Sequence, residues 1–222
     1  MCGRYTLSTA TEDVARVFEV PDYQPLRPRY NVAPSQLVAV IGLKPDGLTR
    51  GMIQVRWGFV PNWASDPTSG PKPINAKSET IHWKSPFADS FRQKRCLIPA
   101  NGFFEWGVEG KRKVAHHFRM RGGGPFAFAG IWDLWRAEGH TPLLSCAIIT
   151  VAANELVKPF HERMPAILRP EHYTPWLASD TSQAELLGML APFPVELMEV
   201  VRVGQAVNKV ANDGPECLEA AA

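Results

Sequence analysis

The chain has 222 residues, 45% of them hydrophobic, which is enough for one large domain with a buried core. No run approaches the roughly 18 consecutive apolar residues that a membrane helix needs, and the N-terminus lacks the basic and then apolar stretch of a secretory signal, so we expect a cytoplasmic protein without membrane contact. The net charge of +2 and the pI near 8.4 fall short of the pI above about 9 that marks an obvious nucleic-acid binder, so any nucleic-acid binding must come from a local basic cluster.

Many turns are expected, because 20 prolines and 17 glycines divide the chain into short apolar segments. The first predicted element is a helix, since Thr9 stands at capping-box spacing before Glu12 and apolar residues follow at helical spacing. In chain order, the pattern then predicts strands at 37–43 and 52–57, a helix from Ser85 through about Gln93, strands at 95–99, 102–108, 114–120, 126–135 and 143–151, a helix starting near Thr181, and a strand at 195–203.

The expected fold is a single α+β domain over residues 1–222, because no repeat, low-complexity segment or linker interrupts the chain. Its centre is predicted to be a mostly antiparallel sheet or open barrel with a few flanking helices. Residues from about 216 onward are predicted to be a frayed C-terminal tail.

The cysteines, at positions 2, 96, 146 and 217, form no C-x-x-C pair. We therefore predict no metal site and no cofactor. Cys96 and Cys146 lie in apolar runs and are expected to be small buried hydrophobes. Only Cys2 has an unusual chemical position.

Removal of Met1, which is usual before a small residue, would give Cys2 an α-amine and a thiol on adjacent carbons. This pair traps aldehydes, since the amine forms an imine and the sulfur closes on the imine carbon to give a thiazolidine ring. The amine is well suited to the reaction, because the ordinary pKa of an α-amine, about 7.7 to 8.0, leaves far more of it neutral at pH 7 than a lysine of pKa about 10.4.

Other interpretations of Cys2 remain open at this point. It can be an incidental second residue, or it can be the nucleophile of an N-terminal-nucleophile amidohydrolase, a class that includes glutamine amidotransferases beginning Met-Cys-Gly. A third alternative is a noncovalent binder of modified DNA, in which Cys2 has no role.

Several compact segments with polar residues among apolar ones follow Cys2 along the chain. They are "MCGRY" (1–5), "RYNVAPS" (29–35), "WGFVPNW" (57–63), "PINAKSET" (73–80), "CLIPANGFFEW" (96–106) and "FHERMPAIL" (160–168). Together, and in this order, these segments resemble the SOS-response-associated peptidase (SRAP) family of abasic-site-processing proteins over about residues 2 to 215.

The resemblance implies an abasic-site sensor for single-stranded DNA that joins its N-terminal cysteine to the opened sugar through a thiazolidine. It also implies removal of the protein's own N-terminal residue and reversal of the crosslink. The implied protein is a nucleoid-associated monomer with DNA as its partner, and replication-fork proteins are candidate further partners.

The resemblance also gives roles to three further residues around Cys2. Glu105 matches the family's catalytic glutamate, and its flanking aromatic residues should raise its pKa toward the working range, although strand alternation alone leaves it exposed. His161 matches the active-site histidine and can protonate the sugar's ring oxygen or assist reversal. Asn75 can position the Cys2 amine or a sugar oxygen, with a turn-forming role as the alternative.

A second set of residues is implied in DNA contact. Arg4 and Arg163 match positions that hold phosphates, whereas Lys77 stands where many relatives carry Arg and so keeps the charge without bidentate contact. Trp63, with Trp106 or Trp57 as further candidates, can stack on bases, unless these side chains belong to the core. Asn31 and the "NDGPE" segment (212–216) resemble backbone-organising turns, and Asn31 is expected to border the DNA site.

Overall fold

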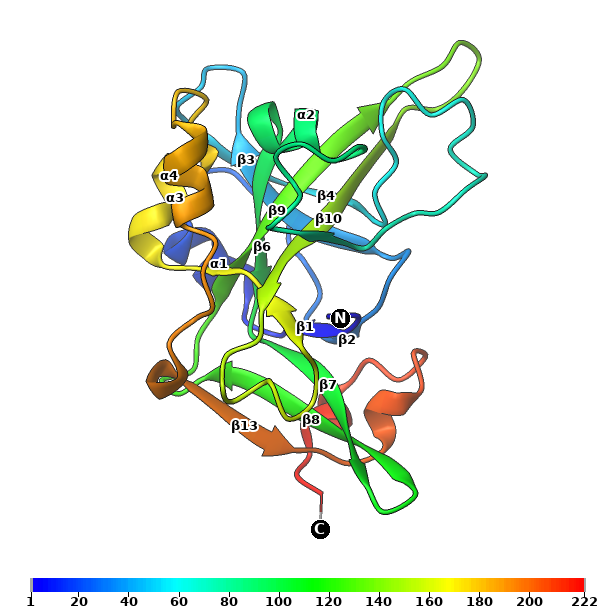
Figure 1. Ribbon diagram of the computed structural model, residues 1–222, viewed down its shortest axis with the longest axis vertical. Coiled ribbons are helices and arrows are strands. Elements are labelled where there is room, and N and C mark those ends of the chain that lie inside the picture. Colours follow the sequence, from blue (N-terminus) through cyan, green and yellow to red (C-terminus); the bar gives the residue numbers. More distant parts are fainter. Residues whose placement is uncertain (1, 222) are drawn as a thin grey trace.

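A closed ring of strands forms the upper part of the molecule in the computed structural model, which describes residues 2–221 (Figure 1). Its strands are β3 (Leu37–Leu43), β4 (Arg50–Trp57), β6 (Arg95–Ala100), β9 (Phe126–Trp135) and β10 (Leu143–Ala152). The pairings β10–β4, β4–β3, β3–β6, β6–β9 and β9–β10 return to the starting strand, and only β10–β4 is parallel among them. The sheet is therefore a small barrel.

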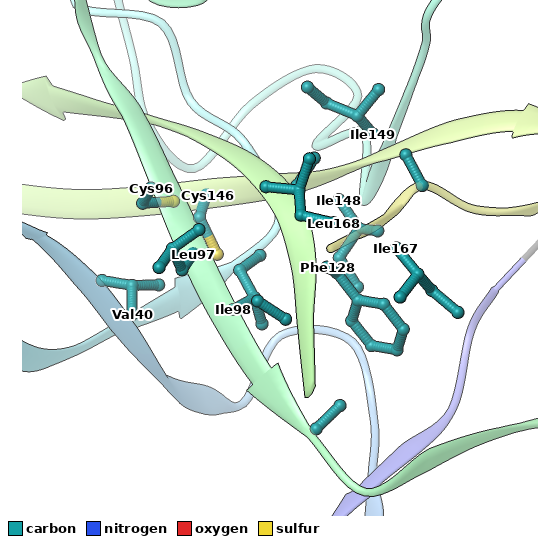
Figure 2. Close-up of a cluster of buried hydrophobic side chains, with 14 of the residues drawn as sticks. Val40, Cys96, Leu97, Ile98, Phe128, Cys146, Ile148, Ile149, Ile167 and Leu168 are labelled. Atoms are coloured by element: carbon teal, nitrogen blue, oxygen red, sulfur yellow. The ribbon is translucent and has the colours of Figure 1, made fainter. Parts of the chain in front are cut away.

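Apolar side chains from all of these strands fill and surround the barrel (Figure 2). The strand β6 is buried at every position, and β10 is buried over most of its length, which matches their nearly continuous apolar sequences. Cys96 and Cys146 lie in this core, as predicted, and are at most 1% exposed. Because the barrel is closed, each of its strands pairs with a neighbour on both sides, and the barrel gives rigid support to the short strands that pair with it.

Short strands extend the barrel around β10 and β9. The strand β5 (Asn75–Lys77) pairs in parallel with β10, while β11 (Arg163–Pro165) pairs with β10 in the antiparallel direction. The strand β12 (Ile167–Leu168) pairs with β9. Two segments far apart in the sequence are thereby held at one end of β10.

A second, antiparallel sheet lies below the barrel in Figure 1. Its order is β13 (Met198–Arg202), β8 (Arg112–Met120), β7 (Gly102–Glu109), β1 (Tyr5–Leu7) and β2 (Arg29–Val32). Phe103 on β7 packs into the main core, while Phe104 packs into a smaller cluster on the other face with Val207 and Cys217. Residues of β7 thus alternate between the barrel side and the C-terminal segment.

The helices are short and peripheral. They are α1 (Thr11–Val17), α2 (Ala88–Gln93), α3 (Tyr173–Leu177) and α4 (Gln183–Gly188), together with 3-10 turns at Pro170–His172, Val195–Leu197, Ala206–Asn208 and Pro215–Leu218. Within residues 2–221, no helix is long and apolar enough to cross a membrane.

The prediction of an α+β fold with a mostly antiparallel sheet or open barrel is confirmed. The capping box predicted at Thr9 is wrong, because the helix begins at Thr11 and the Thr9 hydroxyl accepts a hydrogen bond from Asn101 at 2.7 Å instead. A capping box does begin α4, where the Ser182 hydroxyl accepts from the Glu185 N–H.

The predicted frayed C-terminal tail is also wrong for residues 216 to 221. Residues Pro215–Leu218 form a 3-10 turn, Cys217 is fully buried, and Ala220 forms a β-bridge with Val203. Apolar contacts with the second sheet hold this segment in place, and local composition gives no sign of such long-range contacts.

Candidate functional site

The N-terminal residues run between the barrel and the second sheet (Figure 1). Met1 lies outside the described residues. The side chain of Cys2 is fully buried within the main core, with its sulfur 3.9 Å from the carbonyl oxygen of Arg4. Burial raises the pKa of the Cys2 thiol far above its usual range, and the negative charge of Glu105 adds to the effect. In this conformation the thiol is protonated at neutral pH.

Strand pairing brings Glu105 to the N-terminal segment. Tyr5 is paired with Phe103, and the N–H of Phe104 donates to the carbonyl of Arg4 at 3.0 Å, so Glu105 lies beside the start of β1. Its side chain is buried, with the residue only 6% exposed. Burial raises the pKa of Glu105, and protonation of the nearby His161 ring acts in the opposite direction.

Asn75 holds the main chain of Cys2. The strand β5 carries Asn75 beside β10, and the Asn75 Nδ2 donates a hydrogen bond to the Cys2 carbonyl oxygen at 2.9 Å. Among residues 2–221, its Oδ1 is buried without a hydrogen-bond partner. The amide therefore has one group fixed on Cys2 and one acceptor left for a ligand.

His161 lies just before β11, on the other side of β10. The N–H of Arg163 donates to His161 Nδ1 at 2.8 Å, which favours the neutral tautomer with its hydrogen on Nε2. Thr150 of β10 is paired with both Lys77 of β5 and Pro165 of β11. This shared neighbour explains how the Asn75 and His161 segments reach the same site.

The four residues predicted to be catalytic therefore lie in one group, in which Cys2 and Glu105 are buried and Asn75 and His161 are half-buried. Asn75 donates a hydrogen bond to the Cys2 carbonyl, the Glu105 charge raises the pKa of Cys2, and protonation of His161 would lower the pKa of Glu105. Chemically, the group combines a sulfur, a carboxyl with a raised pKa, an imidazole and an amide, which is suited to moving protons around a nucleophile. Within residues 2–221, no group of His, Cys, Asp and Glu side chains is arranged to hold a metal ion.

Arg4, Asn31 and Trp106 form a second group, beside the C-terminal segment. Arg4 is partly exposed, and its guanidinium lies 5.8 Å from the centre of the partly exposed Trp106 ring. Asn31, which the sequence placed at the DNA site, is completely buried, and its side chain bonds to Arg4 and to backbone carbonyls. In this conformation the Asn31 side chain is bonded within the protein and is not accessible to a ligand, which does not support direct DNA contact by Asn31.

The charged groups of Lys77 and Arg163 differ in exposure and in ion pairing. Lys77 is exposed. Arg163 forms a two-pronged ion pair with Glu79, with Nη2 2.8 Å from Oε2, and its side chain is only 15% exposed. The pairing with Arg163 lowers the pKa of Glu79. A phosphate reaching Arg163 would have to displace this carboxylate.

The tryptophans differ sharply in exposure. Trp57 is fully buried and donates its N–H to the Ile74 carbonyl at 2.9 Å, so the suggestion that it stacks on bases is wrong. Trp63 is 64% exposed. Trp83, for which no role was predicted, is 63% exposed and lines the same hollow of about 370 Å³ as Trp63. The sequence signal for Trp83 was its polar surroundings, "IHWKS" (81–85).

Comparison with known proteins identifies the family of the chain. Residues 1–210 match the family described as SOS response associated peptidase (SRAP). The chain belongs to the SRAP family. The resemblance seen in the sequence segments is thus confirmed over nearly the whole chain.

The alignments with individual relatives and with a solved structure cover most or all of this chain and of the protein it is compared with. The chain is 39% identical to the Bacillus subtilis protein named abasic site processing protein YoaM, over 99% of this chain and 98% of the relative. It is 31% identical to the Gallus gallus protein named abasic site processing protein HMCES, over 98% of this chain and 77% of the relative. A crystal structure of a protein from Bacteroides thetaiotaomicron superposes with a TM-score of 0.90 at 26% identity, covering 100% of each chain.

Proposed function

We propose that the protein captures abasic sites in single-stranded DNA by forming a covalent thiazolidine with Cys2, once Met1 has been removed. The observation that supports this most is the group around the buried Cys2, in which Asn75 holds the Cys2 carbonyl and the charge of the buried Glu105 raises the pKa of the thiol. The printed names of the relatives refer to abasic-site processing, which agrees with this chemistry.

The reaction balances without an external oxidant or metal. The Cys2 amine adds to the aldehyde carbon of the opened sugar, and water leaves to give the imine. The sulfur then adds to the imine carbon, and the thiol proton moves to the nitrogen. Each step moves protons but transfers no electrons to a cofactor.

Glu105 is the proposed proton carrier for these steps. Its buried position raises its pKa, so it can accept a proton from the amine and return it to the departing hydroxyl near neutral pH. The same carboxyl can receive the proton of the Cys2 thiol, which burial keeps from ionising by itself. His161, with its hydrogen on Nε2, is the proposed donor to the ring oxygen when the sugar opens and when the crosslink reverses.

Arg4, Lys77 and Arg163 are the proposed phosphate contacts, and Trp63 and Trp106 the proposed base contacts. Arginine and lysine charges beside an exposed aromatic ring are the usual means of holding a single strand. Trp83 shares the hollow of Trp63 and offers a second exposed ring there. Removal of Met1 by the protein itself is the proposed peptidase activity, which would use the same Glu105.

Crosslinking to an abasic single strand tests the proposal. We expect wild-type protein to give a heat-stable shifted band on a denaturing gel and Cys2→Ala to give none. Cys146→Ala is the matched control, because Cys146 is equally buried but lies in the barrel core. Intact mass measurement should show that the crosslinked fraction does not exceed the fraction lacking Met1. A Cys2→Ala variant that crosslinks like wild type would refute the proposal.

The alternatives have different outcomes in the same experiments. Release of ammonia from glutamine that disappears in Cys2→Ala would favour an amidohydrolase. Retention of DNA on native gels but not on denaturing gels, unchanged by Cys2→Ala, would favour a noncovalent binder.

A further inference from the structure

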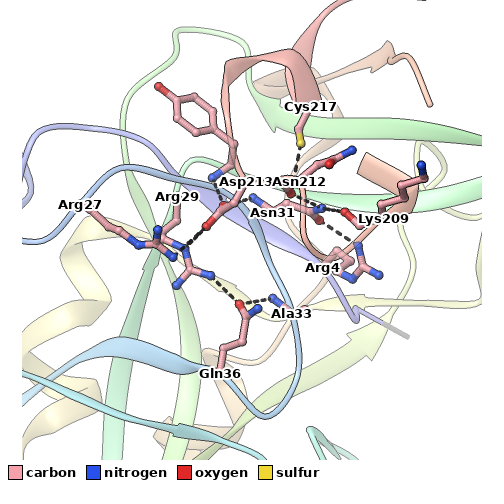
Figure 3. Close-up of polar contacts among 11 residues, drawn as sticks. Arg4, Arg27, Arg29, Asn31, Ala33, Gln36, Lys209, Asn212, Asp213 and Cys217 are labelled. Carbon is pink, nitrogen blue, oxygen red and sulfur yellow. Dashed lines mark hydrogen bonds and ion pairs between the residues drawn. The ribbon is translucent and has the colours of Figure 1, made fainter. Parts of the chain in front are cut away.

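The segment from residue 203 to residue 221, called here the C-terminal clasp, is tied to the start of the chain by a network of polar side chains (Figure 3). Val207 and Cys217 of the clasp are fully buried in the cluster that contains Phe104. The clasp is thus a packed part of the domain, and its polar contacts are held in a fixed geometry.

Asp213 fastens the clasp to β2. One carboxylate oxygen accepts hydrogen bonds from the backbone N–H groups of Tyr30 at 2.8 Å and Asn31 at 2.9 Å. The other oxygen forms an ion pair with the Nε of Arg29. The Asp213 side chain is only 15% exposed. A carboxylate with this many charged and backbone donors is a strong local anchor.

Asn31 connects the clasp to Arg4 through hydrogen bonds to both. The Asn31 Nδ2 lies 3.1, 3.0 and 2.8 Å from the carbonyl oxygens of Val207, Lys209 and Asn212, all in the clasp. Its Oδ1 accepts from Arg4 Nη1 at 2.9 Å, and the same Nη1 donates to the Val207 carbonyl at 2.9 Å. One nitrogen of the guanidinium is thereby fixed, and its orientation depends on where the clasp lies.

Trp106 is held by the clasp as well. Its Nε1 donates to Asn208 Oδ1 at 2.7 Å, while the Arg4 guanidinium lies over its ring. The side chains of Arg4 and Trp106 are therefore both held by hydrogen bonds to the clasp.

We propose that Asp213 is a positioning residue for DNA binding, which sets the orientation of Arg4 and Trp106 by fixing the clasp on β2. This inference rests on the proposed function, because it assumes that Arg4 and Trp106 contact the DNA. Asp213 lies outside the group around Cys2, so its loss should reduce affinity for DNA much more than the crosslinking rate at saturating DNA.

Asp213→Asn tests the proposal against Asp180→Asn. Asp180 is exposed, and either change removes one negative charge, which by itself favours binding to phosphates. We expect Asp213→Asn to weaken binding of an unmodified single strand about tenfold, or about 1.4 kcal/mol, and Asp180→Asn to cause no weakening. The slope of log affinity against log salt should become shallower by about 0.7 in Asp213→Asn, the value of one phosphate contact on a single strand.

A double-mutant comparison shows whether Asp213 acts through the proposed contacts. In a background of Arg4→Gln with Trp106→Leu, measured at low salt where weak binding is detectable, Asp213→Asn should have no further effect. An equal loss in both backgrounds would contradict the positioning role.

Asn208→Ala provides a second test that does not disturb the anchor. Asn208 is exposed, and its replacement should weaken binding in the wild-type background but not in Trp106→Leu. If wild type binds and crosslinks abasic DNA while Asp213→Asn and Asn208→Ala match Asp180→Asn, this inference alone fails. If wild type does not bind single-stranded DNA at all, the proposed function fails with it.

Discussion

Glu105 shows how burial gives an ordinary side chain a chemical role. The carboxyl is placed among apolar neighbours on β7 and next to a thiol that burial also keeps neutral. Burial weakens the preference of the carboxyl for its charged form, so Glu105 takes up a proton more readily than an exposed glutamate does. This is the property that imine formation and ring closure require.

Replacing Glu105 with Gln should therefore slow the reaction without removing the DNA surface. We expect the single-turnover crosslinking rate at saturating abasic DNA to fall by at least about 100-fold, which is the lower range for general acid–base catalysis. Glu109→Gln, on an exposed part of the same strand, is the control. Arg163→Ala should lower affinity more than rate, and a larger loss of rate in Arg163→Ala than in Glu105→Gln would overturn our assignment of roles.

The chemical properties of a residue can be predicted from the sequence where they depend on its covalent structure. They are harder to predict where they depend on side chains that come close only in the folded protein. The proposed reactivity of Cys2 follows from its position directly after Met1. The burial of Glu105 and Trp57, and the pairing of Arg163 with Glu79, depend on contacts between segments that are distant in sequence. From local sequence alone, strand alternation favoured an exposed Glu105, and only the family resemblance pointed to a site role.

Among the structural elements, those that carry the site were the hardest to predict. The long strands β3 and β9 begin and end at the residues expected from their apolar runs. The strands β1, β2, β5 and β11, of three or four residues each, were not predicted at all. Such segments are too short to show a period of two, and they are strands only because a longer neighbour offers hydrogen bonds. They carry Asn31, Asn75 and Arg163.

The pair β7–β8 contains a buried histidine that makes stability depend on pH. Gly102 gives His117 its room, since a Cβ at Gly102 would lie 2.2 Å from His117 Nε2, and this nitrogen is 3.2 Å from the Thr6 hydroxyl. Burial lowers the pKa of His117 to about 4, and Arg119 contributes. The unfolded chain, with a histidine pKa near 6.5, binds this proton at a higher pH than the folded protein does.

The stabilising effect of neutral His117 is therefore complete above about pH 6.5 and is lost as pH falls toward 4. We expect wild type to lose about 2 kcal/mol more unfolding free energy than His117→Gln between pH 7.5 and 5, as measured by urea denaturation. His140→Gln, at an exposed position, should keep the wild-type dependence. Parallel curves for wild type and His117→Gln would show that folding does not lower the pKa of His117.

For the whole molecule, the small net charge limits how DNA can be held. A charge of +2 gives little general attraction to phosphates, so binding must rest on a few local contacts. Each phosphate contact on a single strand contributes about −0.7 to the slope of log affinity against log salt concentration. With Arg4, Lys77 and Arg163 as the proposed phosphate contacts, we expect a slope near −2. Fluorescence titrations would measure this slope at salt concentrations from about 50 to about 300 mM, where phosphate contacts weaken. A slope steeper than about −4 would require a wider basic surface than these residues provide.

The clasp also sets the order in which the molecule can become active during its synthesis. Arg4 leaves the ribosome long before its hydrogen-bond acceptor Val207, which lies 203 positions later. The strand that leads into the clasp, β13, likewise pairs with β8 only after most of the chain exists. A growing chain therefore contains Cys2 well before the group of Arg4 and Trp106 is assembled. Because the proposed removal of Met1 uses Glu105 of the folded protein, the Cys2 amine would stay joined to Met1 in the nascent chain, and capture of aldehydes would begin only after the chain has folded.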